Sequence, residues 1–174
     1  KDRKSKQQNP LDKRGMVGAF CRTYSVPDVI SEFLSEVYEP CDNNPNRYTY
    51  KLGSTAGGLV VYDDGLFAYS NHATDPASCM DLNAFDLVRV HRFRELDEDA
   101  KEGTRVDRLP SYVEMCKFAS EDKKVRKQKL KEQREERDLA FAGEYAEEDP
   151  EVGESWEDKL DLHPKTLRVL NTVQ

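Results

Sequence analysis

The sequence predicts an α+β fold in which helices pack against a small antiparallel sheet. A two-residue turn signal at 64–65, Asp-Gly, separates the apolar runs 59–63 and 66–70, a pattern typical of a β-hairpin. Residues 26–37 carry apolar side chains at helical spacing on one face. Residues 121–142 are rich in charge and poor in apolar side chains, which predicts a long solvated helix after the packed module.

The composition limits how much of the chain can join one core. Of the 174 residues, 37% are hydrophobic and 35% are charged, so apolar side chains are too few to bury the whole length. Changes in composition along the chain therefore predict a modular organisation. The expected segments are a basic tail (1–14), an α+β accessory module (15–120), a charged connector helix (121–142), an acidic linker (143–155) and the start of a further region (156–174).

The first predicted helix spans 25–38 and has a clear start. Ser25 and Asp28 form the S-x-x-D pattern of a capping box, and Pro27 lies in the first turn, where its missing N–H is tolerated. Turn-forming residues at 40–46 follow and are expected to end the helix.

The next segments predict strands. Residues 47–51 alternate so that Tyr48 and Tyr50 share one face. In the hairpin, the turn places Tyr62 opposite Phe67. Both faces of the hairpin carry apolar side chains, so we expect cover on at least part of each side of the sheet.

Two further helices are predicted after the hairpin. Asn83 is the expected N-cap of the second helix, with Asp86 at its third position. A charged loop follows. Ser111 and Glu114 then have the spacing of a capping box, which predicts a third helix through Ala119.

The net charge of −7 conceals segments of opposite sign. A nucleic-acid-binding module usually has a basic surface, because neutralised phosphates supply most of its non-specific affinity. The central module is acidic, so strong DNA contact requires a local patch or the flanks. The net charges are +4 for 1–14, −7 for 15–120, +3 for 121–137 and −8 for 144–161.

Apolar runs and cysteines indicate the compartment. No apolar run approaches the ~18 residues of a membrane span, and no signal-peptide pattern is present, so we expect a protein that neither crosses a membrane nor is secreted. The four cysteines are scattered without a C-x-x-C pair, which favours reduced thiols in a cytosol.

Zinc binding requires three or four converging cysteine or histidine ligands. The available residues are Cys41, His72, Cys79 and His91, and none belongs to a paired motif. We therefore expect no cofactor. A zinc site that includes Cys41, His72 and Cys79 stays the alternative.

A His-Asn-His metal nuclease is a further hypothesis, because His72, Asn83 and His91 follow a hairpin and end on a helix. Such a site needs a metal ligand beside the first histidine, and Asn71 is a poor one. The segment "GSTAGG" also lacks the spacing of a phosphate-binding loop. We therefore expect no catalytic residue in this chain.

Binding of single strands uses stacking aromatics and basic side chains. The aromatic side chains of the predicted sheet are better interpreted as core, whereas polar residues at the hairpin mouth and on the second helix are candidates for surface contact. The predicted nucleic-acid-binding residues are Arg47, Lys51, Asn71, His72, Asp75, Arg89 and Arg92.

Several strings resemble a known family. "GMVGAFCRTYSVPDVISEFL", "GSTAGGLVVYDD", "FAYSNHATDPAS" and "NAFDLVRVH" resemble the accessory region of phage and prophage primase–helicases of the virulence-associated protein E type. The tail "WEDKLDLHPKTLRVLNTVQ" is similar to the lead-in to their ATPase domain. The resemblance implies a phage-encoded middle module in the bacterial cytosol, without its own active site. Its implied partners are the primase-polymerase and helicase domains of the same protein, together with DNA.

A more distant similarity concerns the hairpin. "LVVYDDGLFAYSNHATDP" followed by "NAFDLVRVH" is similar in layout to the zinc-ribbon module of bacterial replicative primases. "SNHATD" stands where a cysteine knuckle is expected, and Cys41 is the remnant near the other knuckle. The similarity thus implies a degenerate, metal-free ribbon in which His72 is structural and still able to touch a template strand.

The sequence leaves three hypotheses for the function of this chain. The first is non-catalytic handling of a single-stranded template or primer, with coupling of the primase and helicase domains. The alternative is a protein-interaction module for oligomerisation or partner binding, which the acidic centre and the solvated helix favour. The third is the metal-dependent nuclease.

Overall fold

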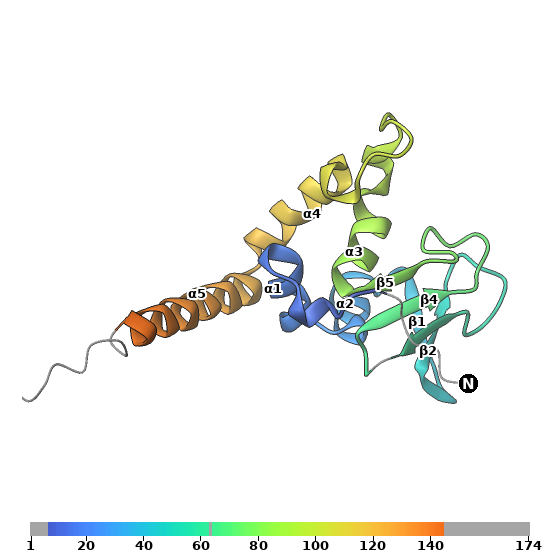
Figure 1. Cartoon of the computed structure of the whole chain (residues 1–174). Coiled ribbons are helices and arrows are strands. Elements are labelled where there is room, and N and C mark those ends of the chain that lie inside the picture. Colours follow the sequence, from blue (N-terminus) through green and yellow to red (C-terminus); the bar gives the residue numbers. More distant parts are fainter. Residues whose placement is uncertain (1–6, 63, 145–174) are drawn as a thin grey trace, which may run out of the picture. The chain divides into compact units, whose positions relative to one another are not determined.

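The computed structural model describes residues 7–62 and 64–144 (Figure 1). It combines helices with a five-stranded antiparallel sheet in the order β1-β2-β3-β4-β5, which confirms the α+β prediction. The chain divides into two compact units, 1–133 and 134–174. Most of the predicted acidic linker and all of the predicted region 156–174 lie outside the described residues.

Most helices are short, and one long helix, α5, ends the described part of the chain. Within these residues no helix is long and apolar enough to cross a membrane. The helices are η1 (Pro10–Asp12), α1 (Gly15–Thr23), α2 (Val26–Phe33), α3 (Ala84–Phe93), η2 (Arg94–Asp97), η3 (Val106–Arg108), α4 (Pro110–Glu121) and α5 (Lys123–Glu144).

The sheet is a meander of neighbouring strands. They are β1 (Tyr38–Cys41), β2 (Asn44–Tyr50), β3 (Leu59–Tyr62), β4 (Phe67–Ser70) and β5 (Asp81–Asn83). Tyr62 pairs with Phe67, as predicted. The turn residues Asp64 and Gly65 have φ angles of 55° and 88°, the left-handed conformation that a two-residue hairpin turn requires.

The capping box of α2 is confirmed, because Ser25 accepts a hydrogen bond from the Asp28 N–H and the Asp28 side chain accepts from the Ser25 N–H. The predicted extent to residue 38 is wrong. The helix ends at Phe33, and Tyr38 belongs to β1, where it pairs with Tyr50. The predicted turn region at 40–46 is the tip of the β1–β2 hairpin, with strand on both sides.

Asn83 caps α3 as predicted, since its side chain accepts a hydrogen bond from the Asp86 N–H at 3.0 Å. The predicted cap at Ser111 is wrong. Helix α4 begins at Pro110, with Leu109 at the N-cap position, and the Ser111 hydroxyl donates instead to Asp97.

The core forms where α3 packs against α1, α2 and α4 and against the sheet (Figure 1). Tyr48 and Tyr50 share the buried face of β2, so these rings belong to the core, as interpreted. The neighbouring strand β3 adds Leu59 and Val61 to the same core. The loops at one end of this sheet carry most of the predicted site residues.

Candidate nucleic-acid interface

The His72 side chain packs against the inner side of the glycine-rich loop 51–58. Its side chain is buried, and the imidazole lies against Gly53 and Gly58. A Cβ added at Gly58 would stand 2.2 Å from His72 Cδ2, closer than real side chains approach. Only glycine therefore fits there, and the ring acts as a structural spacer between the loop and the core.

Polar side chains fix the same loop from its edge. The backbone and side-chain amides of Asn71 both donate to Gly58 O, at 2.9 and 3.1 Å. Arg47 Nη1 donates to Gly57 O at 2.9 Å, and the Gly57 N–H donates to Thr49 Oγ1 at 2.9 Å. The loop is thus held in one arrangement, and the exposed Arg47 and Asn71 side chains lie beside it.

Asp75 is a buried hydrogen-bond acceptor. Its carboxylate accepts from Tyr38 Oη at 2.7 Å, from Ser70 Oγ at 2.6 Å and from the Ala77 N–H at 2.8 Å. Burial alone raises the pKa of Asp75, but the hydrogen bonds from His91, Ser70, Ala77 and Tyr38 outweigh it and hold the pKa below its ordinary value. The group is therefore an ionised structural acceptor.

His91 belongs to the Asp75 network. Its Nε2 lies 2.8 Å from Tyr38 Oη and 3.4 Å from Asp75 Oδ1. Because the Tyr38 hydroxyl donates its one proton to Asp75, it can only accept from His91, which places a proton on Nε2. Burial, followed by the charge of Asp75, raises the pKa of Tyr38 and keeps the phenol protonated.

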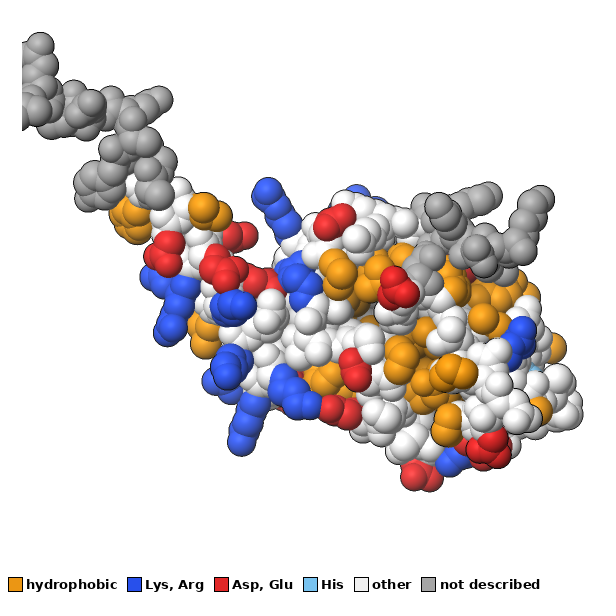
Figure 2. All heavy atoms as spheres, turned by 90° about the horizontal axis from the view of Figure 1, so that it is seen from below, with side chains coloured by type: hydrophobic (Ala, Val, Ile, Leu, Met, Phe, Trp, Pro, Cys, Tyr) orange, Lys and Arg blue, Asp and Glu red, His pale blue; other side chains and the backbone are white. Residues whose placement is uncertain are grey.

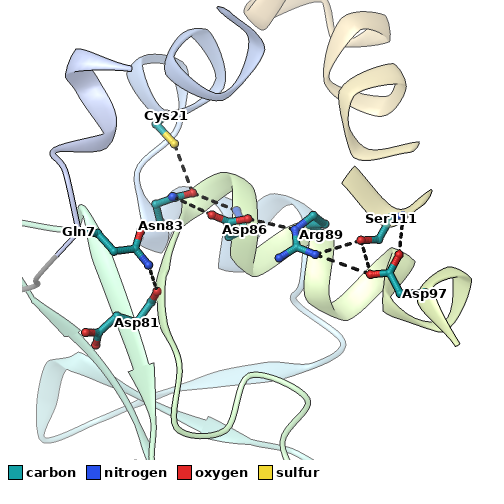
Figure 3. Close-up of polar contacts among 8 residues, drawn as sticks. All are labelled: Gln7, Cys21, Asp81, Asn83, Asp86, Arg89, Asp97 and Ser111. Atoms are coloured by element: carbon teal, nitrogen blue, oxygen red, sulfur yellow. Dashed lines mark hydrogen bonds and ion pairs between the residues drawn. The ribbon is translucent and has the colours of Figure 1, made fainter. Parts of the chain in front are cut away.

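Arg89 is buried on α3, and its guanidinium contacts both α4 and the short helix η2 (Figure 3). Its Nε donates to Asp86 at 3.0 Å, and its Nη1 donates to Ser111 Oγ at 3.0 Å. Asp97 accepts from Ser111 and lies 3.9 Å from the guanidinium. These bonds tie α3 to η2, which follows it directly, and to α4 further along the chain.

The start of α3 extends the polar chain in Figure 3. Asn83 Oδ1 lies 3.7 Å from Cys21 Sγ, and the Gln7 side chain donates to Asp81 O at 2.5 Å. Burial raises the pKa of Cys21 to about 11 and keeps the thiol protonated. Asn83, proposed for the nuclease site, is thus a buried helix cap.

The predicted binding residues separate into two groups. His72, Asp75 and Arg89 are buried, so they offer no surface to a strand in this structure. Arg47, Lys51 and Asn71 are exposed and flank loop 51–58, where contact stays a prediction. Arg92 is exposed elsewhere, on α3. Its guanidinium covers the Phe118 ring at 5.0 Å and donates to Phe33 O.

The zinc candidates have other neighbours. Cys41 Sγ lies 3.4 Å from Thr49 Oγ1, and Cys79 is exposed with a left-handed φ of 59°. No three His, Cys, Asp or Glu side chains converge as ligands in the described part of the chain. The expectation of a metal-free protein stays a prediction.

Among the described residues, the densest run of basic side chains lies on α5, which the sequence predicts as a solvated connector with a net positive charge. Residues 123–131 contain six Lys or Arg and no acidic residue. Lys and Arg side chains gather on and beside α5 in the face shown in Figure 2. The signal was present in the sequence, but the net charge of +3 over 121–137 averaged it with the acidic residues on either side.

Two acidic side chains next to this stretch, Asp122 and Glu132, are already engaged. Asp122 caps α5 by accepting from the Val125 N–H, and it also accepts from Tyr24 Oη. Glu132 accepts two hydrogen bonds from Arg22, at 2.6 and 2.7 Å. This pairing raises the pKa of Arg22 and lowers that of Glu132.

Four of the cations remain available after these pairings. Lys124 pairs with Glu32 at 2.5 Å, and Lys131 has an interaction of its own. Within the described residues no ion pair occupies the other four. These are Lys123, Arg126, Lys127 and Lys129, which we call the α5 basic cluster.

No family model matches the chain, and no curated protein or solved structure is significantly similar to it.

Proposed function

We propose that this chain is a non-catalytic module of a phage primase–helicase of the virulence-associated protein E type. It would hold a single-stranded template or primer in the bacterial cytosol and link the primase and helicase domains of the same protein. The quoted sequence resemblance supports the family. The α5 basic cluster is the observation that supports binding of a polyanion.

The α5 basic cluster has the charge that a nucleic-acid backbone requires. Each Lys or Arg that neutralises a phosphate releases condensed counterions, and this release drives binding more strongly at low salt. The neighbouring carboxylates of Asp122 and Glu132 are engaged within the protein and compete less for these cations. Four available cations within seven residues therefore make α5 the preferred contact in an otherwise acidic protein.

Removal of two of these charges should weaken binding. For the Arg126→Gln/Lys129→Gln variant, we expect about 5- to 20-fold weaker binding of a labelled single strand at low salt, because two phosphate contacts are lost. The slope of log affinity against log salt should fall by about 1.4, at roughly 0.7 per phosphate. Fluorescence anisotropy over a salt series measures both quantities.

A matched control removes the same charge elsewhere. Lys101 and Arg108 are exposed and lie outside α5, so the Lys101→Gln/Arg108→Gln variant should bind nearly as tightly as the parent protein. Equal losses in the two variants would reduce the effect to net charge. Absence of binding by the parent protein at low salt would refute the proposed function.

We expect a second, weaker contact beside loop 51–58. Arg47 and Lys51 are exposed cations there, and both also hydrogen-bond to backbone carbonyls. We expect the Arg47→Gln/Lys51→Gln variant to lose about two- to fivefold in affinity in the same titration, with a smaller change of salt slope. Unchanged binding would remove this surface from the interface.

A further inference from the structure

A pocket opens beside the α5 basic cluster. It has a volume of about 330 Å³, near the lower end of the range for small-ligand sites, roughly 300–1,000 Å³. Helices α1, α4 and α5 contribute its wall. The lining residues are Met16, Ser120, Val125, Arg126, Lys129, Leu130 and Gln133.

The wall combines apolar and cationic side chains. Met16 and Leu130 supply apolar surface, and Leu130 is 56% exposed although it is a large apolar side chain. Arg126 and Lys129 stand in the same wall, and no carboxylate lines the pocket. An occupant should therefore bring an apolar face together with negative charge.

We propose that this pocket takes one unstacked base of the strand that α5 binds, with Arg126 and Lys129 on the flanking phosphates. The inference rests on the proposed function and adds the nucleotide unit that is recognised. A base has the flat apolar face that suits Met16 and Leu130, and its backbone carries charge on both sides. An uncharged apolar side chain of a protein partner would leave the two cations without a counterpart.

The energetics favour single strands over duplexes. Extraction of a base from a duplex costs a few kcal/mol in lost stacking and pairing, whereas a base in a single strand is already accessible. The pocket offers apolar contact but no fixed array of donors and acceptors from buried side chains. We therefore expect preference for single strands with little preference among bases.

Unstacking can be measured with 2-aminopurine, whose fluorescence rises when it leaves its neighbours. We expect a several-fold rise when the full chain binds a short single strand with one 2-aminopurine in a run of adenines. In Leu130→Ser this rise should be lost and the affinity should fall about 3- to 10-fold, because the exposed apolar wall is removed. The same strand with abasic sites should bind both proteins equally weakly.

The matched control is Leu139→Ser, on the same helix outside the pocket and 74% exposed. It should behave as the parent protein. Binding by the parent protein without a fluorescence rise, or with equal affinity for the abasic strand, would overturn the base pocket and leave the proposed function intact. No binding at all would overturn both. A Leu130→Ser variant that changes sedimentation of the protein without DNA would identify a second copy as the occupant and also overturn the inference.

Discussion

Replacement of Asp75 by alanine is expected to lower the free energy of unfolding by about 3–5 kcal/mol, the range for loss of one partner from a buried charged network. The carboxylate is the common acceptor for Tyr38 Oη, Ser70 Oγ and the Ala77 N–H. In the variant Ser70 Oγ and the Ala77 N–H would lose this acceptor while buried, and Tyr38 Oη would keep only its contact with His91 Nε2. Urea unfolding followed by circular dichroism measures the change.

The control for this prediction is an aspartate on the surface. Asp99 is exposed, so Asp99→Ala should change the free energy of unfolding by less than about 0.5 kcal/mol. If Asp75→Ala unfolded at the same urea concentration as Asp99→Ala, the network would contribute nothing to stability. The buried carboxylate would then need another explanation.

The same carboxylate predicts a dependence on pH. The pKa of Asp75 in the folded protein lies below its ordinary value of 3.8, so the unfolded chain takes up the proton first as the pH falls. The stability that Asp75 contributes is therefore complete above about pH 4–5 and is lost as the pH drops through the folded pKa. Asp75→Asn should be less stable at neutral pH and should lose less stability on acidification, measured by urea unfolding at several pH values.

Elements with local signals were predicted from the sequence. The capping box at Ser25, the turn at 64–65 and the cap at Asn83 each lie within a few residues, and all three are present in the structure. Strand β1 was missed because Val37 continues the helical apolar spacing of α2, and because Pro40 and the turn-forming residues after it obscure a four-residue strand that pairs with its neighbour β2. Strand β5 has only three residues and pairs with β4 across the loop 71–80, so its segment carries little local strand signal.

The structure leaves Arg47, Lys51 and Asn71 exposed, so nucleic-acid contact there stays a prediction, whereas His72, Asp75 and Arg89 are buried. A polar residue near a hairpin mouth can face solvent or pair inside, and spacing does not distinguish the two. Arg89 became buried because Ser111, which follows 22 residues later in the sequence, and Asp97 in the adjoining η2 supply its partners. Asp75 did so because Tyr38 reaches it from β1.

The second large effect is expected at Gly58, where alanine should cost about 3 kcal/mol of stability, the upper part of the range for overpacking. The added Cβ would stand 2.2 Å from His72 Cδ2 and 2.4 Å from His72 Nε2. The ring cannot yield easily, because it is buried between loop 51–58 and the core. Thermal and urea unfolding of Gly58→Ala measure the loss.

A double-mutant cycle identifies the imidazole as the cause. His72→Ala should itself be destabilising, since it leaves a cavity and removes the support of the loop. In that background Gly58→Ala should cost little, because its methyl group enters space that the ring has vacated, which gives a coupling energy of about 2–3 kcal/mol.

Gly103→Ala is the reference for backbone strain alone, since Gly103 has a φ of 81° and no atom within 4 Å of an added Cβ. Its penalty of about 1 kcal/mol should be the same with and without His72. Additive effects of Gly58→Ala and His72→Ala would mean that the imidazole does not determine how far loop 51–58 lies from the core. Strong coupling would instead establish that the buried imidazole of His72 is the group that excludes a side chain at position 58 and separates loop 51–58 from the core.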